Sequence, residues 1–68
     1  MAAKIVVIER METVTNQIMI SYKIIDNGFT SPVGHIWIPK DQYSPERERQ
    51  ELEKVLREYL EMKAKGLV

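Results

Sequence analysis

The sequence predicts an α+β fold in which a three-stranded antiparallel β-meander, in the order 1-2-3, precedes one C-terminal α-helix that packs on one face of the sheet. Two observations carry this prediction. Apolar residues recur at helical spacing in the last third of the chain, and β-rich segments joined by the turn sequence Asn27-Gly28 come before it. With 68 residues, the chain is expected to form one domain that spans residues 1 to 68.

The predicted helix spans residues 45 to 65. Ser44 can cap the first turn, and Pro45 suits the first helical position, where no amide partner exists. Gly66 suits the left-handed residue that commonly follows a helix. Residues 45 to 51 contain no large apolar side chain, so we expect the first two turns to project past the core. The apolar stripe begins after them and consists of Leu52, Val55, Leu56, Tyr59 and Leu60.

The predicted strands span residues 4 to 11, 17 to 26 and 29 to 38. The first contains four consecutive apolar residues, 5 to 8, so it presents apolar groups to both faces of the sheet. The second alternates cleanly between apolar and mixed positions, as expected of the central strand. The third contains Pro32 and Gly34, which indicate an edge strand with a bulge or kink at residues 31 to 34.

The Asn27-Gly28 turn sets the register of the third strand. Both residues tolerate positive φ, so they predict a two-residue type I′ turn. Without a bulge, Ile18 pairs with Trp37, Ile20 pairs with His35, and Met19 pairs with Ile36. A bulge at residues 32 to 34 slips this register by one residue and turns Ile36 and Ile38 toward the same face as Ile18 and Ile20.

In the register without a bulge, one face of the sheet is left without a helix and carries a second apolar surface. One helix cannot cover both faces, and a soluble monomer rarely exposes a patch of several large apolar side chains. We therefore expect this face to be the site of self-association. Its residues on this register are Met19, Ile36 and Ile38, joined from the first strand by Ile5 and Val7 or, in the other register of that strand, by Val6 and Ile8.

Charge and composition limit the classes of partner. The chain has 10 Lys and Arg against 10 Asp and Glu, and the two signs are balanced in both halves. This weighs against nucleic acid or an anionic membrane as a partner, since both bind concentrated positive charge. No apolar run is long enough to span a membrane, and the N-terminus lacks the cleavage region of a signal peptide, so we expect a cytoplasmic protein with no membrane partner.

No grouping of residues points to catalysis. His35 is the only histidine, and there is no cysteine, so we expect no metal site and no bound cofactor. No serine lies in a nucleophile elbow, and the helix glutamates alternate with Arg and Lys as in a solvated, ion-paired surface. We therefore expect no catalytic residues and no enzymatic activity.

Two functional hypotheses remain. The first is a small homo-oligomeric interaction or structural protein, such as an accessory or assembly subunit. Its partner is most simply a second copy of the chain, in a homodimer, and a different protein is a further candidate partner. This hypothesis follows from the small size of the chain, since a core this short benefits from association with a second chain. The alternative is a small nucleic-acid-binding module that uses the sheet edge or the start of the helix, where Arg47 and Arg49 lie.

Overall fold

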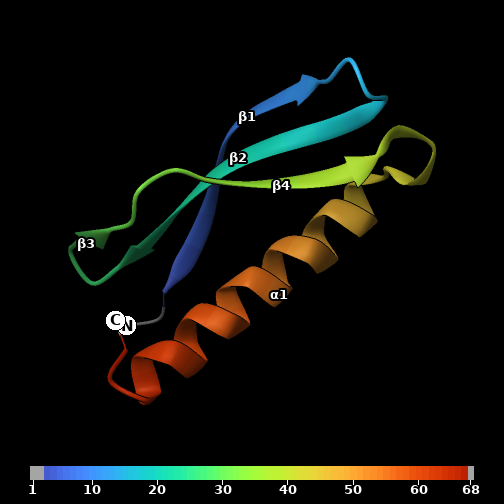
Figure 1. The fold of residues 1–68 in the computed structure, drawn as a ribbon. Helices are drawn as coiled ribbons and strands as arrows, with labels where there is room; N and C mark the ends of the chain where they lie inside the picture. Colours follow the sequence, from blue (N-terminus) through green and yellow to red (C-terminus); the bar gives the residue numbers. More distant parts are fainter. Residues whose placement is uncertain (1–2, 68) are drawn as a thin grey trace.

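The computed structural model describes residues 3–67 and confirms the α+β fold (Figure 1). A four-stranded antiparallel sheet is followed by one long C-terminal helix that lies across one face of the sheet. Both β3 and β4 pair with β2, so they are two parts of the predicted third strand. The elements are β1 (Lys4–Glu12), β2 (Gln17–Asp26), β3 (Phe29–Thr30), β4 (Gly34–Pro39), the short 3-10 helix η1 (Lys40–Gln42) and α1 (Pro45–Ala64).

The turn between β2 and β3 has the predicted form. Asp26 pairs with Phe29, which leaves Asn27 and Gly28 as the two loop residues. Their φ angles are 52° and 93°, so both are positive, as a type I′ turn requires.

The register of β4 shows that the third strand contains the bulge and that the register without a bulge is wrong. Ile25 pairs with Thr30 in β3, but Tyr22 pairs with Gly34 in β4, which is a slip of one residue. The break follows from Pro32, which has no amide hydrogen to continue the ladder. Ser31 compensates locally, because its hydroxyl accepts a hydrogen bond from the Ile24 amide at 2.8 Å.

As a consequence, Ile36 and Ile38 do not lie on the face without a helix. Ile38 pairs with Ile18, and Ile36 pairs with Ile20. Paired residues share a face, and Ile20 and Ile38 are 0% and 1% exposed beneath α1. The prediction that Ile36 and Ile38 belong to the self-association face is therefore corrected.

A second bulge determines which residues of β1 face the helix. Val7 pairs with Tyr22 and Glu9 pairs with Ser21, so Ile8 is the extra residue. Ile5 and Val7 thus share the helix-covered face with the even-numbered residues of β2, and their placement on the opposite face is also corrected. Val6 and Ile8 point to that opposite face, as in the other register considered for this strand.

The limits of α1 follow the predicted capping residues. The Ser44 hydroxyl accepts a hydrogen bond from the Arg47 amide at 3.0 Å. At the other end Gly66 has a φ of 76°, and the Leu67 amide donates to the Met62 carbonyl at 2.9 Å. This is the hydrogen-bond pattern of a Schellman cap, which stops the helix one residue before the predicted end.

The first two turns of α1 do not project past the core, contrary to the prediction. Glu48, in the first turn, is only 7% exposed and contacts the sheet through Arg10. The helix therefore lies on the sheet from its first turn, held there by polar groups where no apolar side chain is present.

The buried apolar core is small. In the described part of the chain, it consists of Ile20, Ile24, Ile38 and Leu52. Leu56 and Tyr59 are only half-buried, and Leu60 is 44% exposed. None of the helices formed by residues 3–67 combines the length and apolarity needed to cross a membrane.

Candidate functional site: the open face of the sheet

Within residues 3–67, no helix covers the side of the sheet opposite α1, which is here called the open face. It carries the odd-numbered residues of β2 and the residues paired with them on both sides. Ile8 joins them at the bulge. The paired residues form rows across the sheet: Lys4, Ile25 and Thr30; Val6 and Lys23; Glu9, Ser21 and His35; and Met11, Met19 and Trp37.

The row of Met11, Met19 and Trp37 is the most apolar part of the open face. Met19 pairs with Met11 on one side and with Trp37 on the other, so the three side chains lie next to each other across β1, β2 and β4. Trp37 is 53% exposed and Met11 is 46% exposed. Ile8, which is 51% exposed, lies beyond the neighbouring row of Glu9, Ser21 and His35.

His35 and Ser21 form a hydrogen-bonded pair in the neighbouring row. The distance from Ser21 Oγ to His35 Nδ1 is 3.0 Å, and Ser21 is only 4% exposed. The His35 ring also lies beside the Trp37 ring, with centroids 6.1 Å apart. The pair satisfies the buried hydroxyl and holds the imidazole against the sheet.

The same pair could be compared with the nucleophile and base of a hydrolase. Such a site also needs a third group that orients the imidazole, and donors for a developing oxyanion. Within residues 3–67, Ser21 is the only side chain that hydrogen-bonds His35. We therefore interpret the pair as part of the surface of the open face.

The other end of the open face is basic. Lys23 lies beside Val6, and Lys4 lies beside Ile25 in the next row. Glu9 is the acidic residue nearest to them on this face. The open face is therefore divided along the strands into an apolar end with Trp37 and a basic end with Lys4 and Lys23.

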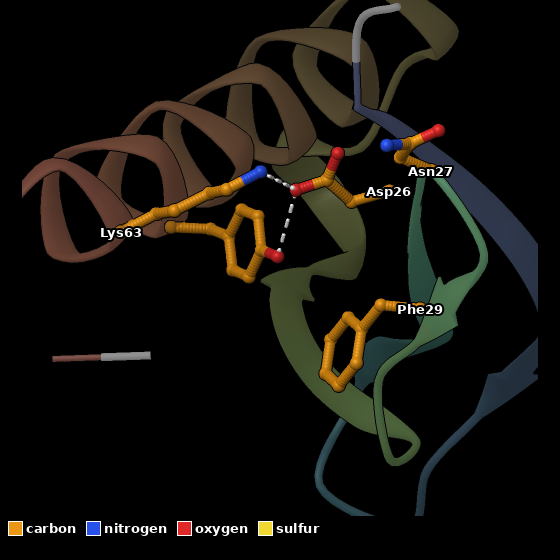
Figure 2. Close-up of a pocket in the computed structure, with 5 residues that line it drawn as sticks. Asp26, Asn27, Phe29 and Lys63 are labelled. Atoms are coloured by element: carbon orange, nitrogen blue, oxygen red, sulfur yellow. Dashed lines mark hydrogen bonds and ion pairs between the residues drawn. The ribbon is translucent and has the colours of Figure 1, made fainter. Parts of the chain in front are cut away.

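A polar cluster joins the other face of the sheet to the C-terminal half of α1. Figure 2 shows Asp26, at the end of β2, accepting a hydrogen bond from the Lys63 ammonium group. The Tyr59 hydroxyl donates to the same carboxylate oxygen at 3.0 Å. The bond from Lys63 is the main reason that the pKa of Asp26 lies below its ordinary value. Phe29 stacks on Tyr59, with ring centroids 6.4 Å apart.

A second polar cluster joins the sheet to the start of α1. Arg10 donates to both carboxylate oxygens of Glu48, at 2.7 and 2.6 Å, and the Tyr43 hydroxyl donates to the same carboxylate at 2.8 Å. The hydrogen bonds from Arg10 are the main reason that the pKa of Glu48 lies below its ordinary value. The two clusters attach both ends of the helix to the sheet, so we assign them a structural role.

Sequence reasoning missed both clusters because the hydrogen bonds that link the sheet to α1 join residues 33 to 38 positions apart along the chain. No sequence pattern around Glu48 distinguishes it from the other glutamates of the helix. The open-face residues Trp37 and Met11 were also missed, since two bulges decide their orientation.

Of the predicted helix-end residues, Arg47 is half-buried and Arg49 is exposed, and both form ion pairs. Arg47 Nε donates to Glu51 at 3.0 Å, and Arg49 bridges Glu46 and Glu53. These carboxylates reduce the positive potential that a phosphate backbone would meet. Among residues 3–67, no group of three or more His, Cys, Asp or Glu side chains could hold a metal ion.

No protein family, curated protein or solved structure matches this chain. A function therefore has to be argued from the open face and its chemistry.

Proposed function

We propose that this chain is a cytoplasmic homodimeric interaction or structural protein, rather than an enzyme, and that its open face is the surface by which two copies associate. The observation that carries this proposal is the row of Met11, Met19 and Trp37, which crosses three strands on a face without a covering helix. Met and Trp are enriched at the centres of protein interfaces, where their large side chains lose contact with water.

The exposed apolar area is large for a molecule of this size. A Trp side chain has up to about 250 Å² to bury, so Trp37 at 53% exposure leaves on the order of 130 Å² in water. Ile8 and Met11 are similarly exposed. Val6 and Ile8 lie on the other side of the row of Glu9, Ser21 and His35, so the open face carries two exposed apolar areas separated by polar residues. The whole described surface is only 4884 Å².

A second copy is the occupant that best fits the weakness of the core. With four buried apolar side chains in the described part of the chain, the fold gains from additional burial at all times, not only when a particular partner is present. A second copy is available wherever the chain is synthesised. A two-fold dimer is also the simplest closed assembly.

The mass in solution tests the proposal. Wild-type protein is expected at twice the chain mass of 8.0 kDa in sedimentation equilibrium. Trp37 is the only tryptophan, so its emission reports the open face directly, and it should shift to shorter wavelength as concentration rises. Because a dimer is stabilised by mass action, its melting temperature should rise over the same range.

A matched pair of variants separates the open face from other exposed apolar positions. Met11→Lys, at 46% exposure on the open face, is expected to yield monomers. Leu60→Lys, at 44% exposure on α1, is expected to remain dimeric. If Met11→Lys is too unstable to sediment as a folded species, the concentration dependence of wild-type melting still decides the question.

Two results would overturn the proposal. One is a stable monomer at about 100 μM whose melting temperature does not depend on concentration. The other is a monomer that binds a mixed-sequence single-stranded oligonucleotide at about 50 mM salt, with affinity that falls steeply as salt rises. That second result would favour the nucleic-acid alternative, with Trp37 as a stacking platform.

A further inference from the structure

The two ends of the open face differ in a way that restricts how two copies can meet. This inference rests on the proposed self-association. Met19 lies in the apolar row, and Lys23 lies four residues away on the same strand, about 13 Å at the rise of a β-strand. A two-fold axis between the sheets can run along β2 or across the strands, and the two choices place Lys23 in different surroundings.

An axis along β2 brings each row over the same row of the other copy, along the whole strand. Lys23 of one copy then faces Lys23 of the other between sheets that pack about 10 Å apart. Both ammonium groups lose water and repel each other, and the nearest carboxylate on the open face of each copy, that of Glu9, lies in the next row and not in the row of Lys23. This arrangement is electrostatically unfavourable.

An axis across the strands, through the row of Met11, Met19 and Trp37, avoids this cost. Each of these side chains then lies near its counterpart, and the apolar ends of the two sheets overlap. The basic ends, with Lys4 and Lys23, extend in opposite directions and stay in water.

We therefore propose that the dimer has its two-fold axis across the strands over Met19, so that β2 of one copy runs antiparallel to β2 of the other. The α1 helices lie on the outside, and the dimer has four layers in the order helix, sheet, sheet, helix. The Ser21–His35 pair of one copy then lies over the row of Gln17 and Pro39 of the other, since both rows are next to the axis. Polar groups therefore border the apolar contact on both sides.

Ile25 gives a decisive measurement because it lies far from the proposed axis. It is six residues from Met19 on the same face, so the two copies of residue 25 are separated by about twelve residues, or about 40 Å. An axis along β2 instead places them roughly 10 Å apart, one sheet spacing. The chain has no cysteine, so a single introduced cysteine carries the only label.

The experiment is a distance measurement by double electron–electron resonance on Ile25→Cys carrying a nitroxide label. Thr30→Cys is a second site, because Thr30 pairs with Ile25 in the same row. The expected result is a distance near 40 Å at both sites, with the labelled protein still dimeric by mass. A distance below about 20 Å at either site would refute the axis across the strands.

The mass of the labelled protein separates failure of this inference from failure of the proposed function. If the label at residue 25 makes the protein monomeric while the wild type is dimeric, residue 25 lies in the contact and the proposed axis is wrong. If the wild type is itself monomeric, the proposed function fails together with the inference.

Discussion

Gly34 is the position where one added methyl group tests the packing of β4 against β2. A Cβ atom at Gly34 would lie 2.5 Å from Cζ, 2.6 Å from the hydroxyl oxygen and 2.8 Å from Cε1 of Tyr22. Carbon atoms prefer separations of about 3.5–4.0 Å, so the ring must move by roughly 1 Å. Tyr22 pairs with Gly34 on the face covered by α1, and such overpacking costs about 1–3 kcal/mol. Gly34→Ala should therefore lower the free energy of unfolding by this amount.

The presence or absence of the Tyr22 ring should reverse the sign of the stability change caused by Gly34→Ala. Gly34 is not among the glycines with positive φ, so without the Tyr22 ring an alanine should stabilise the fold by about 0.4–1 kcal/mol. Urea unfolding followed by circular dichroism, at one fixed protein concentration, measures Gly34→Ala in the wild type and in Tyr22→Val. Alanine should destabilise the first and be neutral or stabilising in the second. Equal effects in both backgrounds would show that the ring does not lie over Gly34.

Two further predictions concern α1. Leu52→Ala should cost about 2–5 kcal/mol in urea unfolding because Leu52 is 6% exposed, and Leu56→Ala should cost less because Leu56 is half-buried; the reverse order would mean that a different helix face contacts the sheet. Glu48→Gln should cost about 1–2 kcal/mol at pH 7, a modest loss because Arg10 is half exposed and solvent screens its charge. The pKa of Glu48 is lowered in the folded state, so its contribution is present above the ordinary value of 4.5 and disappears as pH falls through the lowered pKa. The stability difference between wild type and Glu48→Gln should therefore be constant at neutral pH and shrink in acid, and a difference that grows in acid would contradict the ion pair.

The sequence by itself determined the elements and their limits where the cause is local. Ser44 and Gly66 set the ends of the helix through hydrogen bonds and a φ angle within a few residues of themselves. Asn27 and Gly28 set the turn in the same way. The first two strands were predicted to within one residue, whereas the predicted third strand is divided into β3 and β4.

The tertiary structure decided which side chains occupy the open face. A bulge of one residue turns every later side chain to the opposite face, and two bulges occur here, at Ile8 and between β3 and β4. The sequence indicated a bulge near Pro32 but could not decide between the two registers. That choice depends on burying Ile36 and Ile38 against α1, with Trp37 left outside. The preferred register is therefore set by the energy of the whole packed arrangement of strands and helix. For this reason Trp37 and Met11 became candidate interface residues only in the folded chain.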